Sequence, residues 1–342
     1  MEYRQLGRTG TRVSKLCLGT MNFVLSTELE EAKRIVDEAI DSGVNFIDTA
    51  DVYARGGSEE FTGIALKENG KRDSVVLATK AVARMGDGPN DHGASRYHLT
   101  RAVEMSLRRL QTDRIDLFYL HITDITTPLD EILDTLDVLV KQGKILYIGT
   151  SKWPVPLFME LLTMAEKHGW PRTVAEQPPY NLTDRRIEWE LVWACMRHGI
   201  AIVPFGPLAG GILSGVYRKG QPTPEGHHFK EVGQRDGHNR YTEATMELVE
   251  KLVPLAEARG CSLAEFSLAW LMQRPGITSP IAGPRTVDHL RSCVAACDIE
   301  LTQDELDKVD EAIEPGGHIT NYCTLYDRMC RAVNTGEPLG PF

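Results

Sequence analysis

The chain has 342 residues, of which 42% are hydrophobic, and it carries a formal net charge of −10 at pH 7. This length and composition allow one large globular, soluble domain or two small ones. Because the sequence shows no domain boundary, we expect a single domain spanning residues 1–342. The acidic balance argues against a nucleic-acid partner or an anionic membrane surface, because both require basic patches. The N-terminus has no apolar signal segment, and no run approaches the roughly 18 apolar residues that cross a bilayer. We therefore expect a cytoplasmic protein.

Apolar runs typical of β-strands recur along the chain and alternate with amphipathic stretches. The strand-like runs are Val13–Gly19, Asn45–Thr49, Ser74–Lys80, Asp116–His121, Ile145–Ser151, Thr173–Gln177, Ala201–Phe205 and Ser279–Gly283. The amphipathic stretches include Leu29–Ser42, His98–Leu110, Leu129–Gln142, Pro156–His168 and Asp184–His198. A strand followed by a helix, repeated eight times, predicts an α/β fold, the (β/α)8 TIM barrel.

Two segments depart from this alternation. Residues 208–243 follow the seventh strand-like run and are rich in Gly, Pro, His and charged residues. They show neither the alternation of a strand nor the three-to-four spacing of a helix. We expect a long lid over a ligand at the barrel mouth, with a decorating loop as the alternative. The tail, residues 316–342, is also loop-like, and its Tyr322, Tyr326 and Phe342 are expected to pack across the mouth or to cover the outside of the barrel.

Metal chemistry finds little support in the sequence. The seven cysteines are scattered without a Cys-x-x-Cys pair, which indicates reduced structural thiols. Cys293 and Cys297 have the spacing of one helix face, so a metal or a disulfide there is the alternative. A polar stretch contains His227, His228 and His238. Its composition favours a solvated loop over a group of metal ligands. We expect no metal site.

Four polar residues stand out for their positions relative to the strand-like runs. Asp48, Lys80 and His121 each lie at or near the end of a run, and Tyr53 follows the second run. Because barrel enzymes hold their active sites at the C-terminal ends of the strands, we expect these four side chains to meet. A tyrosine acts as a general acid near neutral pH only if a cation assists its phenol.

Lys80 can be that cation, provided that a carboxylate keeps it charged after burial, and Asp48 can be the carboxylate. His121 can hydrogen-bond a carbonyl oxygen while Tyr53 donates the proton. Taken alone, Lys80 and Asp48 could form a structural ion pair, His121 could be a core histidine, and Tyr53 could lie on a surface loop. Their joint placement at strand ends favours a site that polarises a carbonyl group.

With these residues in place, the sequence resembles the aldo-keto reductase superfamily from about residue 3 to residue 314. The resemblance rests on the segments Leu6–Gly10, Leu18–Met21, Asn45–Tyr53, Leu77–Lys80, Ser106–Leu110, Asp116–His121 and Gly143–Ser151. It implies a barrel that binds NADPH, with NADH as the alternative, and that reduces aldehydes, ketones or keto-sugars. It also implies that Asp48, Tyr53, Lys80 and His121 form the catalytic tetrad.

The resemblance further implies where the cofactor binds. The implied binding residues are Gly19, Thr20, Met21, Asp48, Ser151, Lys152, Gln177, Phe205, Gly206, Pro207, Leu208, Gly210, Gly283, Arg285 and His289. Among these, Ser151 and Gln177 would hydrogen-bond the nicotinamide carboxamide, and Phe205 would stack on its ring. The pyrophosphate would lie along the segment 207–210. No Gly-x-Gly-x-x-Gly joins a strand to a helix, so a Rossmann crevice is not expected.

The adenosine end is expected at residues 283–290, where Arg285 and a helix N-terminus can bind a 2′-phosphate. This chain departs from the family pattern here, because His289 and Cys293 replace the usual Gln and Asn, and Lys152 replaces an Asn elsewhere. Phe23, Trp153 and Tyr180 would line an aromatic pocket for a neutral carbonyl substrate. Loops set specificity in a barrel, so the sequence does not identify the substrate.

Two other functions stay open at this point. The potassium-channel β subunits share this barrel, so a cofactor-binding regulatory subunit with little turnover is one alternative. A metal-dependent barrel hydrolase, suggested by the histidines of the insert, is the other. The only expected partner is a small carbonyl compound, and a homo-oligomer is compatible with the pattern of the helix surfaces.

Overall fold

The computed structural model describes residues 1–221 and 240–320. Eight parallel strands follow one another around a curled sheet in the order β10-β3-β4-β5-β6-β7-β8-β9. They are β3 (Cys17–Gly19), β4 (Phe46–Asp48), β5 (Val76–Ala81), β6 (Ile115–Leu120), β7 (Ile145–Ser151), β8 (Thr173–Gln177), β9 (Ala201–Ile202) and β10 (Ile281–Ala282). The N–H of Ile281 donates to the carbonyl of Pro204 at 2.8 Å, which links the last strand to the segment after β9. The expected (β/α)8 barrel is confirmed.

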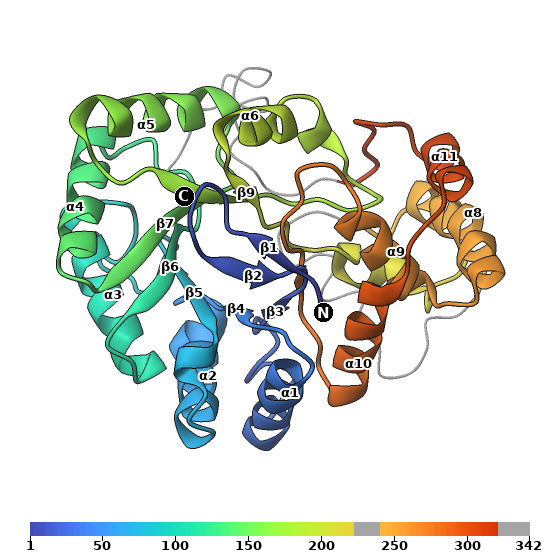
Figure 1. The fold of residues 1–342 in the computed structure, drawn as a ribbon, viewed down its shortest axis with the longest axis horizontal. Helices are drawn as coiled ribbons and strands as arrows, with labels where there is room; N and C mark the ends of the chain where they lie inside the picture. Colours follow the sequence, from blue (N-terminus) through green and yellow to red (C-terminus); the bar gives the residue numbers. More distant parts are fainter. Residues whose placement is uncertain (222–239, 321–342) are drawn as a thin grey trace.

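Helices surround the strands, as Figure 1 shows. They are α1 (Leu29–Asp41), α2 (Gly57–Glu68), α3 (Arg96–Leu110), α4 (Leu129–Lys141), α5 (Val155–His168), α6 (Leu191–His198), α8 (Glu243–Arg259), α9 (Leu263–Met272), α10 (Val287–Ala295) and α11 (Gln303–Ala312). Short 3-10 turns are η1 (Tyr53–Gly56), η2 (Arg72–Ser74), η3 (Arg186–Glu188), η4 (Ala209–Ser214) and η5 (Ala296–Asp298). The part of the chain described here contains no helix long and apolar enough to cross a membrane.

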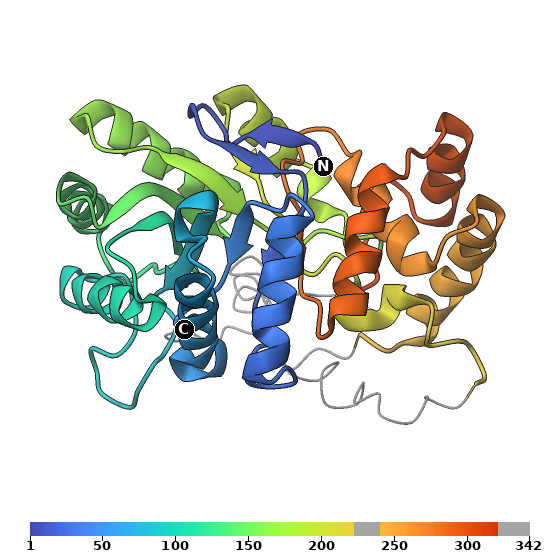
Figure 2. The ribbon, with the colours of Figure 1, turned by 60° about the horizontal axis from the view of Figure 1, so that its bottom comes forward.

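An antiparallel hairpin of β1 (Tyr3–Gln5) and β2 (Arg12–Ser14) precedes the barrel. Its turn packs against the segment before β9 and the first half of β8, because a Cβ on Gly7 would lie 2.4 Å from the carbonyl oxygen of Val174 and 2.9 Å from that of Gly199. Figure 2 shows this hairpin at one end of the barrel. It therefore covers the ends at which the strands begin and leaves the C-terminal ends available for a site.

The expected strands Ala201–Phe205 and Ser279–Gly283 are shorter in the structure, at Ala201–Ile202 and Ile281–Ala282. Two further expected elements differ in kind. The run Val13–Gly19 is not one strand, because β2 pairs with β1 in the hairpin and only β3 joins the barrel. The stretch Asp184–His198 is not one helix: η3 and α6 are separate, and residues Asp184 and Arg185 form a buried polar corner instead. There the backbone N–H of Arg185 donates to Gly317, and its guanidinium bonds Asp310 and Glu188.

The two irregular segments are only partly described. Of the expected lid, residues 208–221 contain η4, and the last residue, Glu243, already begins α8. Of the expected tail, residues 316–320 run beside Thr183 and Asp184, with which Ile319 and His318 pair. Residues 222–239 and 321–342 lie outside the described residues, so the lid and the packing of the tail stay predictions. The histidines 227, 228 and 238 and the aromatic residues 322, 326 and 342 belong to these parts.

The cysteines of the described residues are free. Cys293 and Cys297 are both buried, and the Cys297 thiol lies 3.8 Å from the sulfur of Met272. Burial raises the pKa of Cys293 to about 12 and that of Cys297 to about 11, which keeps both as neutral thiols. Within residues 1–221 and 240–320, no three His, Cys, Asp or Glu side chains are grouped so as to hold a metal ion.

Candidate active site

Neighbouring strands bring three of the four expected catalytic residues to one end of the barrel. Asp48 is the last residue of β4, Lys80 is the penultimate residue of β5, and His121 directly follows β6. In the sheet register Asp48 lies beside Ala78, and Lys80 lies beside Tyr119. Because parallel strands end at the same edge, this register places the three side chains at the C-terminal mouth.

Lys80 is the centre of the polar cluster. Its ammonium donates to the Asp48 carboxylate, to the carbonyl oxygen of Thr49 at 2.8 Å, and to the hydroxyl of Tyr53 at 3.1 Å. An ammonium has three protons, so each of them has a partner. The side chains of Lys80 and Asp48 are 0% and 2% exposed, and solvent therefore does not compete for these bonds.

The pKa values of this cluster follow from burial and from the ion pair. Burial raises the pKa of Asp48, although the bonds from Lys80 and Gln177 oppose the rise. Burial acts to lower the pKa of Lys80, but the negative Asp48 and the Tyr53 hydroxyl outweigh it and raise the pKa. Burial also raises the pKa of Tyr53, and Lys80 is the largest opposing influence. Tyr53 is therefore a neutral phenol held next to a cation.

His121 faces Tyr53 across the mouth. The two rings meet edge to face, with centroids 5.7 Å apart and planes 85° to each other. Burial lowers the pKa of His121 well below its usual value, and the positive charges of Lys152 and Lys80 lower it further. The imidazole is thus neutral, and its buried Nδ1 has no hydrogen-bond partner among the described residues. A neutral imidazole can orient a carbonyl oxygen without adding charge.

Ser151 and Gln177, expected at the nicotinamide carboxamide, end β7 and β8 at the same mouth. The Ser151 hydroxyl donates to the carbonyl oxygen of Gln177 at 2.8 Å. The Gln177 amide nitrogen donates to the Asp48 carboxylate at 2.9 Å, a bond that the sequence did not predict. Phe205 lies beyond β9, and the Lys152 ammonium is 6.0 Å from the centre of its ring.

The remaining expected cofactor residues lie at the end of β3, on the loops after β3, β9 and β10, and in the first turn of α10. Thr20 directly follows Gly19 and donates its backbone N–H to the carbonyl oxygen of Asp48 at 3.0 Å, while Met21 is 43% exposed. After β9, Gly206 and Gly210 both have positive φ, at 67° and 68°. The same loop holds Pro207 and Leu208, which leads into η4.

The expected adenosine end is next to α10. Asn22 donates to the carbonyl oxygen of Gly283 at 2.7 Å, and Thr27 donates to that of Arg285 at 3.1 Å, so the loop after β3 holds the loop after β10. Arg285 is exposed, and its positive charge opposes the rise that burial causes in the pKa of Tyr217. His289 lies in the first turn of α10, where its N–H donates to the Thr286 hydroxyl at 3.2 Å.

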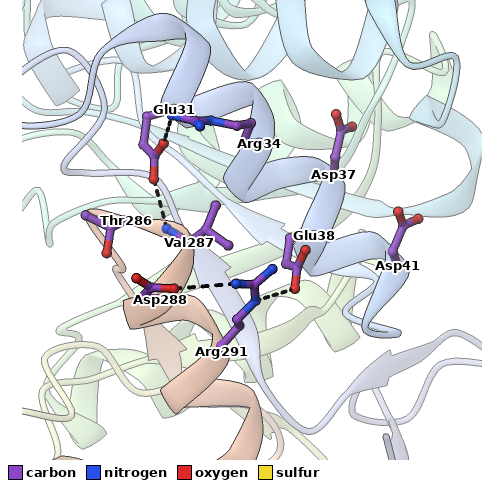
Figure 3. Close-up of a pocket in the computed structure, with 9 residues that line it drawn as sticks. All are labelled: Glu31, Arg34, Asp37, Glu38, Asp41, Thr286, Val287, Asp288 and Arg291. Carbon is purple, nitrogen blue, oxygen red and sulfur yellow. Dashed lines mark hydrogen bonds and ion pairs between the residues drawn. The ribbon is translucent and has the colours of Figure 1, made fainter.

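A shallow hollow beside this end lies between α1 and α10 (Figure 3). Acidic side chains dominate it, and Glu31 accepts the backbone N–H of Val287 at 2.9 Å. Arg291 forms ion pairs with Glu38 at 2.8 Å and with Asp288 at 3.4 Å. The hollow contains none of the four expected catalytic residues, so the barrel mouth is the candidate active site instead.

The three expected substrate residues are all buried: Phe23, Trp153 and Tyr180 are 0%, 3% and 1% exposed. The Tyr180 hydroxyl donates to Glu188, and its ring lies 5.4 Å from that of Trp270, which places Tyr180 in the packing around the Arg185 corner. The pocket-lining role of these residues stays a prediction.

A second buried ionic cluster behind the tetrad was not predicted. Glu59, which is 0% exposed, accepts from Arg109 at 2.6 Å and from Thr79 at 2.5 Å. Asp51 is buried nearby, neither of its carboxylate oxygens is hydrogen-bonded by a described residue, and burial together with the charge of Glu59 raises its pKa well above the usual value. The sequence signal that could have predicted this cluster is a charged residue, Glu59, among the residues of α2 that pack inward.

The sequence was compared with those of known proteins, and three similar proteins are described below. Residues 15–314 match the model of the aldo/keto reductase family. The chain is 39% identical to an uncharacterized oxidoreductase, YrpG, of Bacillus subtilis, over 93% of this chain and 98% of that protein. It is 33% identical to a probable voltage-gated potassium channel subunit beta of Arabidopsis thaliana (92% and 97% covered) and 32% identical to the versiconal hemiacetal acetate reductase of Aspergillus parasiticus (92% and 99%).

Proposed function

This chain belongs to the aldo/keto reductase family and is an oxidoreductase of carbonyl compounds, and we propose that it reduces an aldehyde, ketone or keto-sugar to the alcohol with NADPH. The observation that carries the proposal is the shared ammonium of Lys80, which bonds Tyr53 and Asp48 at the mouth of the barrel. A buried cation beside a neutral phenol is what a tyrosine general acid requires.

The proposed roles follow from the charges. A nicotinamide cofactor, when bound, supplies the hydride to the carbonyl carbon. Tyr53 protonates the carbonyl oxygen, and Lys80 stabilises the phenolate that remains. Asp48 keeps Lys80 charged in a buried position, and the neutral His121 orients the oxygen from the opposite side.

The residues at the mouth fit a nicotinamide nucleotide. Ser151 and Gln177 offer a hydroxyl and an amide beside Asp48, where a carboxamide could exchange hydrogen bonds with them. Phe205 offers a ring for stacking, and residues 206–210 offer a glycine-containing loop for the pyrophosphate. The exposed guanidinium of Arg285 favours NADPH over NADH, because it can bind the 2′-phosphate bidentately.

The test is a titration of intrinsic protein fluorescence with NADPH and with NADH, followed by turnover with aldehydes, ketones and keto-sugars at the nicotinamide absorbance. We expect tighter binding of NADPH and multiple turnovers with at least one carbonyl class. A protein that binds neither nucleotide would refute the proposal.

The second candidate is a cofactor-binding regulatory subunit, which the likeness to a potassium channel subunit beta supports. The two functions differ in one readout. Tight binding of NADPH with no multiple-turnover activity on any carbonyl would favour the regulatory subunit. The complete Asp48, Tyr53 and Lys80 cluster favours turnover, because a protein that only binds the cofactor has no need of a positioned proton donor.

A further inference from the structure

A buried carboxylate lies directly behind the nicotinamide end of the mouth. Along β8, side chains alternate between the two faces, and Gln177 reaches Asp48 on the inner face. Glu176, the residue before it, consequently points to the outer face and is 0% exposed. Its Oε1 accepts the backbone N–H of Trp153 at 3.2 Å, and its Oε2 accepts no hydrogen bond from the described residues.

The backbone that Glu176 holds is unusual. Lys152, between Ser151 and Trp153, has a φ of 60°, which a residue with a side chain rarely adopts. Such a conformation persists only when neighbouring contacts impose it. Thr123 donates its hydroxyl to the Lys152 carbonyl oxygen at 3.2 Å, and Glu176 accepts the next N–H of the chain. The turn is therefore held on both sides of the Lys152–Trp153 peptide.

This turn sets the position of a charge inside the proposed site. The Lys152 ammonium lies 6.0 Å from the centre of the Phe205 ring, the proposed stacking partner of the nicotinamide. Its positive charge also contributes to the low pKa of His121. A change in the turn would therefore alter the surroundings of Phe205, of His121 and of the adjacent Ser151 together.

The charge of Glu176 is sensitive to its surroundings. Burial raises its pKa to about 7, although the nearby Thr150 hydroxyl, the N–H groups of Trp153 and Lys152 and the charge of Lys152 oppose the rise. Cys195 of α6 also lies near it, and burial raises the pKa of that thiol, so it stays neutral. Lys152 is therefore the cation among these neighbours.

We propose that Glu176 is a positioning residue of the cofactor site, which holds the Lys152–Trp153 turn from behind so that Lys152, Phe205 and Ser151 are arranged for the nicotinamide. The inference rests on the proposed function, since it assumes that the mouth binds this cofactor. Glu176 itself touches neither cofactor nor substrate in this proposal.

The first test compares Glu176→Gln with the unchanged protein by NADPH fluorescence titration between pH 5.5 and pH 8. Glutamine keeps the shape and one acceptor but removes the charge, and charge-assisted hydrogen bonds are roughly twice as strong as neutral ones. We expect the dissociation constant of NADPH to be about tenfold higher in the variant than in the unchanged protein at pH 8. At pH 5.5 the two proteins should have nearly equal dissociation constants. The ratio at each pH cancels any titration of the cofactor phosphate.

Asp116→Asn is the matched control. Asp116 is also a buried carboxylate that accepts a backbone N–H, from Leu77 at 2.8 Å, but it lies near the start of β6, away from the mouth. We expect this variant to melt earlier, because Asp116 pairs with Arg72 and Arg114, and to bind NADPH normally. Glu176→Gln should instead keep its melting temperature at pH 8 while losing affinity, which a merely structural role would not produce.

Hydrogen–deuterium exchange of the cofactor-free protein gives a reading that is independent of the proposed function. The amide of Trp153 should exchange about tenfold faster in Glu176→Gln than in the unchanged protein. Equal exchange, or equal NADPH affinity at pH 8, would overturn the positioning role. Faster exchange in a protein that binds no nicotinamide nucleotide would support the hydrogen bond from the Trp153 N–H to Glu176 as what holds the turn. It would refute the proposed function instead.

Discussion

Tyr53 is the residue on which the proposed proton transfer depends. Replacing it with phenylalanine removes the hydroxyl and keeps the ring that faces His121. We expect kcat to fall roughly a thousandfold, within the 10²–10⁴ range of general acid catalysis, with unchanged affinity for NADPH. Steady-state kinetics and fluorescence titration measure the two quantities. Tyr97→Phe, at a tyrosine that is 59% exposed on α3, should change neither. Near-normal turnover in Tyr53→Phe would mean that another group is the acid.

Asp48 is expected to act through Lys80. With Asn at position 48, burial still lowers the pKa of Lys80, but the negative charge that raises it is gone. The ammonium then loses its proton at a lower pH, so the alkaline limb of the pH–rate profile should move to lower pH. Lower stability is also expected, since the buried lysine loses its ion-pair partner.

The measurement is kcat against pH for Asp48→Asn and for Asp116→Asn, whose carboxylate pairs with arginines instead of Lys80. Only the first should shift the alkaline limb. An unshifted profile in Asp48→Asn would contradict the relay from Asp48 through Lys80 to Tyr53.

At the scale of elements, α2 is held against α3 at a glycine. A Cβ on Gly63 would lie 2.6 Å from the carbonyl oxygen of Arg109 and 2.6 Å from the carbonyl carbon of Leu110, and backbone atoms cannot move aside as a flexible side chain can. We expect Gly63→Ala to lower the free energy of unfolding by about 1–3 kcal/mol despite the better helix propensity of alanine. Urea denaturation measures it. Gly10→Ala, where a Cβ would meet nothing within 4 Å, should be neutral.

Sequence patterns predicted the strands better than the helices between them. The strand ends at Asp48, Lys80 and His121 were identified because a buried apolar run stops at a polar residue. The stretch that forms α2 gave no clear apolar face, because Ser58, Glu59 and Thr62 are among its buried residues and the polar cluster around Arg109 satisfies some of them. The stretch from Asp184 has helical spacing, but the ion pairs of Arg185 hold it in another conformation.

For the whole molecule, the order of the strands was predictable because consecutive strands joined by helices lie side by side. Contacts between side chains across the barrel were not predictable from the sequence. Gln177 and Asp48 are 129 residues apart in the sequence and are bonded through the barrel interior. The clamp of Glu176 on the Trp153 N–H likewise depends on the register of β7 against β8, which shifts between Ile148 and Gly149. Such contacts depend on side-chain direction and register, which one sequence does not determine.

The net charge of −10 has a consequence for the proposed cofactor, whose phosphates are also negative. The overall field repels it, so binding must depend on local cations and on helix N-termini. Arg285 is such a cation, exposed beside the start of α10. We expect Arg285→Ala to raise the dissociation constant of NADPH about tenfold or more and to leave that of NADH nearly unchanged.

Arg291→Ala separates this local contact from the overall charge. Arg291 lies on the same helix but is paired with Glu38 and Asp288 (Figure 3). Each variant removes one positive charge, which changes the net charge from −10 to −11. If the overall field governs affinity, both variants should weaken NADPH equally, and NADH with it. If Arg285 binds the 2′-phosphate, only Arg285→Ala should separate the two cofactors, because the phosphate that distinguishes them meets that guanidinium alone.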